Sequence, residues 1–491
     1  MTSSPLASHF IQGKWISGEG PSFSSINPAT GKMVWEGNAA TQNEVNRAVS
    51  AAKQAANQWG NLTIQERISY FRRFETLLKE NQNELSKIIS EEMGKPRWES
   101  LSEVQSMIGK ISLSIESQAL FCSDSLKDQG QTRLVTRHKP HGTVAVFGPF
   151  NFPGHLPNGH IVPALLAGNT VVFKPSEKTP FTALMTVTLW QEAGLPDGVL
   201  NLVQGAKETG SYLAQHPDLN GIFFTGSWAT GRWLLEHLAD KPEKILALEL
   251  GGNNPLVIGS ISDIKAAAYQ TIQSAFLTSG QRCTCARRLI IEEGKIGDLF
   301  LETLVHMAST IQIGAYTDFP EPFMGPLVSK EAANQLFSAY QNFVSNGAIE
   351  LLPMNKSEAF ISPSILDVTP VSSRADEEFF GPLLQVIRVP SFSEAINEAN
   401  NTVYGLAAGL FSDDPEQYQQ FRKKIRAGLV NWNVPLTGAS SAAPFGGIGH
   451  SGNHRPSAWY AAYYCSYPVA SVESDRLQMP SKIVAGIKGT S

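Results

Sequence analysis

The stretch SGQRCTCARR, residues 279–288, places two of the chain's four cysteines one residue apart with arginines on both sides. A tetrahedral zinc site needs four ligands. The pair supplies two, no matching Cys or His pair follows nearby, and the arginines oppose a cation. A thiolate, in contrast, is stabilised by nearby positive charge, so we predict a lowered pKa and a nucleophilic role for a cysteine here. Burial of both cysteines as small apolar side chains explains the stretch equally well.

Two polar residues elsewhere extend this chemistry. Glu249 lies in LALELGGNNP, at the end of an apolar strand, where a carboxylate beside a thiolate can act as the general base that hydrolyses a thioester. Asn151 lies in FGPFNFPGH, just after another strand, and its amide can donate to a developing oxyanion. An asparagine at the end of a strand is also a common turn former, so this residue type alone decides nothing.

Two further segments suit a nucleotide. In FFTGSWATG a strand runs into Gly226 and Ser227 before a helix begins, and backbone N–H groups at such a helix start favour a pyrophosphate. A glycine turn with a serine cap accounts for the same letters. In VVFKPSE, Lys174 and Glu177 follow a strand, where an acid accepts hydrogen bonds from a ribose and repels a 2′-phosphate. Both are also ordinary surface charges. The literal GxGxxG at 447–452 has no apolar strand before it, so we discount it.

The elements that must position these residues alternate in type. Short apolar runs such as TVAVFG, TVVFKP, LNLVQG and GIFFTGS alternate with helical patterns, which predicts βαβ units and a parallel, doubly wound sheet. A second series, NNPLVIG, RRLIIEE, LLQVIRV and GLAAGLF, predicts a second α/β lobe. A hairpin is expected around FIQGKWISGEG. Thr41 and Glu44 form a capping box for a helix through Trp59, and a long helical pattern stops at Gly94.

Bulk composition narrows the class of protein. A chain of 491 residues is too long for one core, so two or three lobes are expected. The formal net charge of -5 disfavours nucleic acid and anionic membrane surfaces as partners. The opening residues lack the pattern of a secretory signal, and no apolar stretch reaches the length of a membrane span. Four cysteines make no disulfide framework, so we expect thiols in a cytoplasmic protein.

Together these pieces resemble the aldehyde dehydrogenase family over nearly the whole chain. FNFP, FKPSE, FTGS, ELGG, GQRC, EEFFGP and PFGG occur in the family's order, and seven motifs in one order are far more specific than any one of them. The resemblance implies a Rossmann-type NAD-binding domain (1–124 and 141–250), an α/β catalytic domain (251–447), and a small β oligomerisation arm with the C-terminal tail (125–140 and 448–491). A homodimer or a dimer of dimers is the family precedent.

Site roles follow from the resemblance, residue by residue. Cys283 is the implied nucleophile, Glu249 activates water, and Asn151 with the Cys283 backbone N–H forms the oxyanion hole; Cys285 has no assigned part. The residues implied to bind NAD are Lys174, Glu177, Thr225, Gly226, Ser227, Gly231, Glu378 and Phe380. No metal is implied. The implied reaction is NAD-dependent oxidation of an aldehyde through a thiohemiacetal and a thioester.

The substrate is narrowed by departures from the general pattern. Asn253 and Asn254 stand after ELGG, where most relatives have lysine, and IGHSGNHRPSAWYAAYYC follows PFGG. These segments resemble family members that act on a dicarboxylate semialdehyde, whose pocket should offer cations or clustered donors. The candidates for holding the two carboxylates are Arg282, Gly438, Ala439, His454 and Arg455. Structural ion pairing explains the charged ones equally well.

Three alternatives stay open. A dehydrogenase of succinate semialdehyde or glutamate semialdehyde would share the catalytic residues and differ in the size of the pocket. A catalytically silent NAD-binding protein on the same fold is a second alternative, against which the presence of Cys283, Glu249 and Asn151 argues. A zinc protein built on Cys283 and Cys285 is the third.

Overall fold

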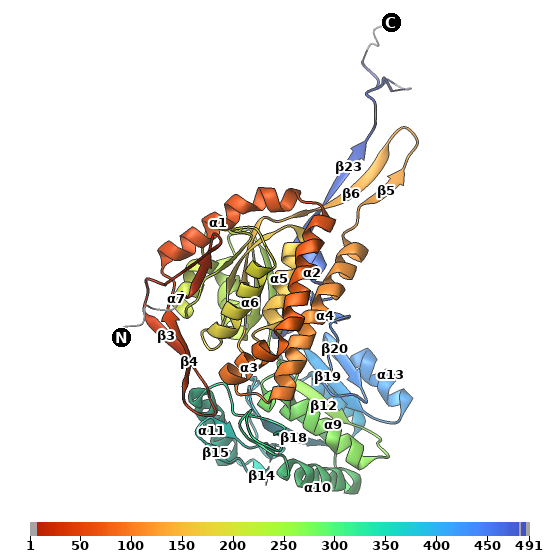
Figure 1. Ribbon diagram of the computed structural model, residues 1–491. Coiled ribbons are helices and arrows are strands. Elements are labelled where there is room, and N and C mark those ends of the chain that lie inside the picture. The colour runs from red at the N-terminus through yellow and green to blue at the C-terminus, as the bar shows by residue number, and fades with distance from the viewer. Residues whose placement is uncertain (1–6, 481–482, 488–491) are drawn as a thin grey trace, which may run out of the picture.

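The first βα series forms one seven-stranded sheet in the computed structural model, which describes residues 7–480 and 483–487 (Figure 1). Its strands are β1 (His9–Ile11), β2 (Lys14–Ile16), β7 (Thr143–Phe147), β8 (Thr170–Lys174), β9 (Leu200–Leu202), β10 (Gly221–Gly226) and β11 (Ile245–Leu250). Their order is β11-β10-β7-β8-β9-β1-β2. The first five are parallel, and the predicted hairpin β1–β2 adds antiparallel strands at one edge.

Helices cover both faces of this sheet. They are α1 (Gln42–Asn61), α2 (Ile64–Glu80), α3 (Gln82–Met93), α4 (Arg97–Phe121), α5 (His155–Ala167), α6 (Pro180–Glu192), α7 (Lys207–Ala214) and α8 (Trp228–His237). Because successive strand residues face opposite ways, Val144 and Val146 of β7 pack in a core with α2, α4, α5 and α6, whereas Ala145 packs with α1, α7 and α8. This double covering is why the strands read as continuous apolar runs.

The predicted helical pattern from Glu66 to Gly94 is two helices, α2 and α3, which meet at Asn81. Gly94 ends α3 with a φ of 79°, a left-handed conformation that glycine adopts without strain. At the start of α1, the Thr41 N–H donates to the Glu44 carboxylate at 2.8 Å, as the capping box requires. Helix α4 went unpredicted, because its buried residues include Glu99, Glu103 and Lys110 and no apolar stripe marks it.

The second series forms another seven-stranded sheet. Its strands are β12 (Asn254–Ile258), β13 (Ala286–Glu292), β14 (Ile349–Leu352), β17 (Ser364–Asp367), β18 (Leu383–Val389), β19 (Ala407–Phe411) and β20 (Leu429–Trp432), in the order β14-β17-β18-β13-β12-β19-β20. Only edge strand β14 runs antiparallel within it. One face packs on α9 (Ile264–Phe276) and α10 (Lys295–Ser309), and the other on α11 (Lys330–Ser345), α12 (Phe392–Asn400) and α13 (Pro415–Lys424).

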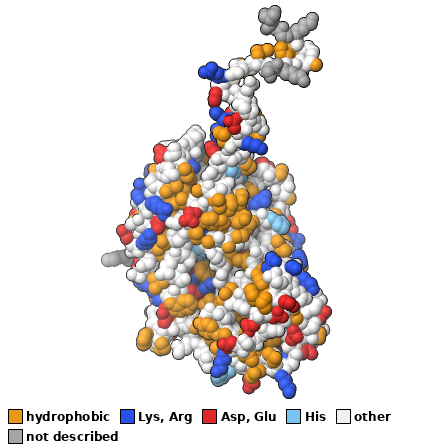
Figure 2. All heavy atoms as spheres, turned by 90° about the vertical axis from the view of Figure 1, so that its right-hand side faces the viewer, with side chains coloured by type: hydrophobic (Ala, Val, Ile, Leu, Met, Phe, Trp, Pro, Cys, Tyr) orange, Lys and Arg blue, Asp and Glu red, His pale blue; other side chains and the backbone are white. Residues whose placement is uncertain are grey.

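A three-stranded sheet projects from the body as an arm (Figures 1 and 2). It consists of β5 (Ser125–Asp128), β6 (Arg133–Pro140) and β23 (Ser466–Glu473), in the order β23-β6-β5. The shorter elements are β3 (Ser22–Ile26), β4 (Met33–Asn38), β15 (Lys356–Ser357), β16 (Phe360–Ile361), β21 (Pro444–Phe445), β22 (Ser457–Ala458) and α14 (Ala461–Cys465). The C-terminal tail, expected to be extended, therefore forms a strand on its own chain's β6.

The expected fold is confirmed: the chain forms two α/β lobes, each built on a doubly wound sheet, and a small β arm. The domain limits given above stay a prediction. Residues 1–6 of the segment 1–124, and residues 481–482 and 488–491 of the segment 448–491, lie outside the described part of the chain. Among the described helices, none is both long and apolar enough to cross a bilayer.

Candidate active site

Four predicted site residues lie at one edge of the first sheet. Asn151 follows β7, Lys174 ends β8, Gly226 ends β10, and Glu249 is the fifth residue of β11. Because these strands are parallel, their carboxyl ends share an edge. The chain places β8 on one side of β7 and β10 on the other, so the order of strands reverses here. Such a reversal opens a crevice at the carboxyl edge, where doubly wound proteins bind ligands.

Cys283 is carried by a turn between α9 and β13. Thr278 and Ser279 have φ of 58° and 54°, and Gly280 has φ of 70°, so three successive residues are left-handed. A Cβ at position 280 would lie 2.2 Å from the carbonyl oxygen of Gly381, so only glycine fits there. The Ser279 hydroxyl donates to the Gly325 carbonyl at 2.7 Å, which fastens the turn.

Side chains of β12 and β13 hold the backbone around Cys283 by hydrogen bonds. The Asn254 amide donates to the carbonyl of Cys283 at 2.6 Å and to that of Cys285 at 2.9 Å. The buried Arg287 guanidinium donates to the carbonyls of Gly280 and Arg282 at 2.7 and 2.9 Å. Asn254, which stands where most relatives have lysine, and Arg287, one of the arginines beside the cysteines, thus fix the loop that carries the Cys283 thiol.

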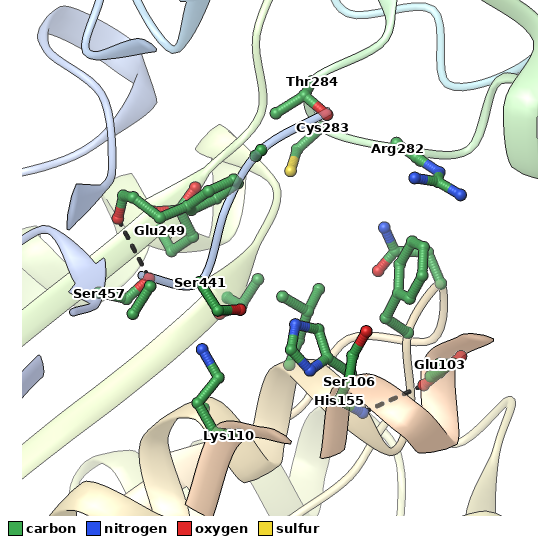
Figure 3. Close-up of a pocket in the computed structure, with 18 of the residues that line it drawn as sticks. Glu103, Ser106, Lys110, His155, Glu249, Arg282, Cys283, Thr284, Ser441 and Ser457 are labelled. Atoms are coloured by element: carbon green, nitrogen blue, oxygen red, sulfur yellow. Dashed lines mark hydrogen bonds between the residues drawn. The ribbon is translucent and has the colours of Figure 1, made fainter. Parts of the chain in front are cut away.

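Cys283, Glu249 and Asn151 line one cavity (Figure 3). Asn151 is 4 % exposed, and its amide donates to the Gln281 carbonyl at 2.9 Å. An amide nitrogen carries two N–H groups, so one bond fixes the side chain beside the cysteine loop while the second N–H stays available for an oxyanion. Neither carboxylate oxygen of Glu249 has a hydrogen-bond partner among the described residues, although both are buried.

The electrostatics correct one expectation. Burial, followed by the charges of Glu249 and Glu378, raises the pKa of Cys283 well above its ordinary value, and Arg287 opposes this only in part. The predicted lowering of the pKa of this thiol is therefore wrong, because the flanking arginines are engaged with backbone carbonyls and with Glu99 rather than with sulfur. Burial also raises the pKa of Glu249 well above its usual range. A thiol in this site needs a base, and a carboxylate of raised pKa faces the same cavity.

Cys285 differs from its neighbour. Its side chain is fully buried, its Sγ lies 3.7 Å from the Leu277 carbonyl, and burial raises its pKa. It does not line the cavity, so its surroundings fit the packing alternative, whereas Cys283 lines the cavity. In the part of the chain that the structure describes, no three His, Cys, Asp or Glu side chains gather into a metal-binding group.

The proposed pyrophosphate turn has the expected form. Ser227 caps α8, its hydroxyl accepting from the Thr230 N–H at 3.4 Å. Gly231 lies buried against Leu250: a Cβ there would come 2.7 Å from the leucine Cδ2, so the glycine allows α8 to pack closely on β11. Thr225, also predicted to bind NAD, lines the same cavity as Cys283, and its hydroxyl lies 3.0 Å from His160 Nε2.

The remaining nucleotide residues lie in two places. Lys174 Nζ lies 4.0 Å from Glu177 Oε2 at the end of β8. Glu378 is 3.8 Å from Arg287, and burial raises its pKa to about 7. The oxygen in this ion pair, Oε1, is buried and accepts no hydrogen bond from a described residue, which suits a hydroxyl donor such as a ribose. Phe380 is in edge contact with Phe150.

The predicted substrate residues are not all brought together. Ala439 and Arg282 line the cavity, with Thr437, Ser440 and Ser441 beside Ala439; Gly438 does not line it. The Arg282 guanidinium donates to Glu99 at 2.6 Å, so its charge is already neutralised. His454 and Arg455 lie outside the cavity lining, although Ser457 and Ala458, a few residues further along the chain, belong to it.

Sequence reasoning missed one wall of the cavity, which α4 supplies. Glu99, Glu103, Ser106 and Lys110 all line it, together with Ser102. Their spacing of four, three and four residues is that of one helical face, and it is the signal that identifies this wall. Polar residues at that spacing normally indicate a solvated face, which is why the pattern passed without notice.

Comparison with known proteins agrees with this geometry. The sequence profile described as "Aldehyde dehydrogenase family" matches residues 15–468. The chain belongs to the aldehyde dehydrogenase family. It is thus an oxidoreductase that acts on aldehydes with a nicotinamide nucleotide, as expected from its motifs.

Individual relatives cover the chain almost completely. An N-succinylglutamate 5-semialdehyde dehydrogenase from Pseudomonas fluorescens is 55% identical over 98% of this chain and 100% of its own. An indole-3-acetaldehyde dehydrogenase from Pseudomonas syringae, solved with NAD+, is 30% identical with a TM-score of 0.90 over 96% of this chain and 97% of its own. An NADP-dependent glyceraldehyde-3-phosphate dehydrogenase from Bacillus halodurans, solved with NADP, is 28% identical with a TM-score of 0.90 over 96% of this chain and 100% of its own.

Proposed function

We propose that this enzyme oxidises N-succinyl-L-glutamate 5-semialdehyde to N-succinyl-L-glutamate with NAD, as a step of arginine degradation through succinylated intermediates. The observation that carries the proposal is the convergence of Cys283, Glu249 and Asn151 on one cavity whose other wall bears charged side chains. The 55% identity to a relative of that name supports the choice of substrate.

The acylation half begins at the Cys283 thiol. Because the pKa of this thiol is raised, its proton must leave as sulfur attacks. Glu249 accepts it, since Glu99 and Glu103 in the same cavity are already ion-paired. The Sγ–C bond forms, and the aldehyde oxygen becomes an oxyanion held by the free N–H of Asn151 and the backbone N–H of Cys283. When bound, the nicotinamide nucleotide accepts the hydride that leaves the substrate carbon. The product of this half is a thioester on Cys283.

The deacylation half uses the same carboxylate. After Glu249 has released the proton of Cys283 to solvent, it takes a proton from water and the hydroxide adds to the thioester carbon. The C–S bond then breaks, and Glu249 returns the proton to the departing sulfur, which releases the carboxylic acid and the thiol. A carboxylate of raised pKa is a stronger base than an ordinary one, and the unpartnered oxygens of Glu249 leave room for the water. Hydrolysis, rather than transfer to another thiol, is the outcome that such a base favours.

NAD is the nucleotide we assign. We assign Lys174 and Glu177 to the adenosine ribose, and Gly226, Ser227 and the start of α8 to the pyrophosphate. Glu378 and Phe380 are assigned to the nicotinamide riboside. Glu177 supports NAD over NADP, because a carboxylate near the ribose repels a 2′-phosphate.

The substrate's two carboxylates need separate partners. We assign the α-carboxylate to the loop from Thr437 to Ser441, where Ala439 and two serines line the cavity. Gly438 contributes at most its backbone from outside the lining, and His454 and Arg455 have no part in this assignment.

We also propose a homo-oligomer, a dimer or a dimer of dimers, in the cytoplasm. Figure 2 shows hydrophobic side chains gathered on the face beside the arm. Leu120, Tyr463 and Tyr467, near the base of the arm, are 64%, 53% and 44% exposed. The arm with this face supports association with a second copy. The four cysteines are free thiols, as a reducing compartment allows.

The test is a panel of semialdehydes assayed for NADH and NADPH formation. We expect kcat/KM for the succinylated glutamate semialdehyde to exceed that for free glutamate semialdehyde and for succinate semialdehyde by about 100-fold or more, and NAD to be preferred. Equal rates on all three aldehydes would reject the substrate, and no aldehyde-dependent reduction would favour a silent nucleotide-binding protein.

A further inference from the structure

Lys110 is a buried cation without an anion. It lies in the fourth turn of α4, is 4 % exposed, and lines the cavity that holds Cys283. Among the described residues, its ammonium group has no hydrogen-bond partner and no ion pair. A buried charge normally has a partner in the protein, because removing it from water costs several kcal/mol.

The acids that are near in sequence on the same helix face are already engaged. Glu103 is 2.6 Å from Lys95 Nζ, and Glu99 is 2.6 Å from Arg282. The two histidines on which the Lys110 charge acts, His155 and His160, cannot serve as anions, and burial lowers the pKa of each to about 3, so both are neutral. Of the lysines and arginines that line the cavity, Lys110 is the one whose charge no acid compensates.

Lys110 faces the reacting sulfur across the cavity. In Figure 3 its side chain rises from α4 on the side opposite Cys283, and Ser441 of the loop lies between them. A group bound at Lys110 therefore lies across the cavity from the bond that reacts (Figure 3).

The proposed substrate carries two carboxylates, one near the aldehyde and one at the end of the succinyl chain. The loop from Thr437 to Ser441, which lies nearer to Cys283 than Lys110 does (Figure 3), suits the carboxylate near the aldehyde. We propose that Lys110 is a specificity-determining residue whose ammonium group binds the terminal carboxylate of the substrate's N-succinyl chain. This inference rests on the proposed function and goes beyond it, since it names the group that distinguishes a succinylated substrate from other acylated or free ones. Burial lowers the pKa of Lys110 to about 8, which leaves it charged at neutral pH.

The test compares two substrates that differ only in that carboxylate: N-succinylglutamate 5-semialdehyde and N-butanoylglutamate 5-semialdehyde, in which a methyl group replaces it. The variant is Lys110→Met, which keeps the unbranched shape and most of the length of the side chain without its charge, and Lys265→Met is the matched control on exposed surface. We expect Lys110→Met to lose about 10- to 150-fold in kcat/KM on the succinyl substrate, mainly through KM, because a charge-assisted hydrogen bond is lost. On the butanoyl substrate we expect a change below about 3-fold, and Lys265→Met should match the parent on both.

Several outcomes overturn the inference. An equal loss on both substrates means that Lys110 acts on the α-carboxylate or on the fold. If the parent enzyme prefers the succinyl substrate and Lys110→Met keeps that preference, Lys110 does not read the carboxylate although the proposed function stands. If the parent enzyme turns over free glutamate semialdehyde as well as the succinylated one, the proposed function fails and the inference falls with it.

A second measurement covers a variant that does not fold. In the unmodified enzyme, amidination of Lys110 by methyl acetimidate is followed by mass spectrometry of its peptide. Protection by N-succinylglutamate and not by N-butanoylglutamate supports the assignment. Equal protection by both, or by neither, refutes it.

Discussion

The side-chain amide of Asn254 donates to the backbone carbonyl of Cys283 at 2.6 Å, from the first residue of the neighbouring strand β12. The same nitrogen reaches the Cys285 carbonyl at 2.9 Å, and the amide oxygen accepts from the Ala407 N–H at 3.0 Å. One buried side chain thus ties the cysteine loop to β12 and β19. The backbone N–H of Cys283, which we assign to the oxyanion, belongs to this fastened loop.

Replacing this amide should loosen the nucleophile without removing it. For Asn254→Ala we expect unfolding to become easier by about 1–3 kcal/mol, since two buried carbonyls lose their donor. We also expect kcat to fall more than KM rises. Thermal unfolding and steady-state kinetics check this, with Asn334→Ala at an exposed position of α11 as control. A variant with an unchanged melting temperature and unchanged kcat would show that the bond does not position the loop.

Mutation of the two cysteines of the CTC stretch should have different effects, on activity for Cys283 and on stability for Cys285. Cys283→Ala is expected to abolish aldehyde oxidation, because the Sγ that forms the thioester is gone. Cys285→Ala should keep most of the activity and lose about 1 kcal/mol or more of stability, because it leaves a small void in a fully buried site. Iodoacetamide labelling with mass spectrometry should mark Cys283 as activity disappears. Inactivation with label only on another cysteine would contradict the assignment.

Glu249→Gln should stall the enzyme after the first half-reaction. We expect steady-state turnover to fall by about 10²–10⁴-fold, as for loss of a general base, with a thioester detectable on Cys283 by intact mass. Asp218→Asn, an exposed acid remote from the cavity, serves as control. Accumulation of no acyl-enzyme, together with a large loss of rate, would indicate that Glu249 is needed mainly for thiol deprotonation.

The pH dependence of turnover should report the same carboxyl. A carboxyl of raised pKa becomes a base only when pH rises past that raised value, so the acid limb of kcat should lie well above pH 4.5. Glu249→Gln should flatten this limb in the residual rate. Measurement of kcat across the acid range decides it, and an acid limb at the ordinary carboxyl pKa would show that Glu249 titrates as an exposed acid does.

Buried histidines should make the fold acid-sensitive. The pKa of His9 is lowered to about 4 and those of His155 and His160 to about 3, in each case chiefly by burial. In the unfolded chain these groups bind protons near pH 6.5, so the unfolded state binds more protons between pH 6.5 and about 4. Stability is therefore fully present above pH 6.5 and falls as pH drops, by up to about 1.4 kcal/mol per pH unit for each histidine.

His160→Asn should reduce the slope of the free energy of unfolding against pH by the contribution of one proton, which is up to about 1.4 kcal/mol per pH unit. Denaturant unfolding at a series of pH values measures it, and the exposed His306→Asn should keep the parent slope. The slope, rather than the absolute stability, is the relevant quantity, because His160 also contacts Tyr464 and Thr225. Parallel curves for His160→Asn and the parent would refute the buried, neutral state of this histidine.

The amino-acid sequence by itself determined the strands, most of the helices and the order of the chemical motifs. Apolar runs such as TVAVF and GIFFT can form little except buried parallel strands, and Gly94 and Gly280 stand where the backbone is left-handed. The sequence also pointed to Cys283, Glu249 and Asn151. Glu249 and Asn151 lie near the carboxyl ends of β11 and β7, Cys283 lies just before β13, and each carries the needed functional group.

Only the tertiary structure decided the electrostatics and the substrate wall. The arginines around Cys283 suggest a lowered pKa when read along the chain, but in space they face backbone carbonyls and Glu99, and burial raises the pKa instead. The sequence pattern indicates a solvated lysine at position 110, but in the folded chain Lys110 is buried at the cavity. Burial and charge pairing depend on which distant segments meet, and sequence proximity does not encode that. The order of the motifs therefore predicts the class of reaction, whereas the proposed substrate contacts depend on how α4 packs at the cavity.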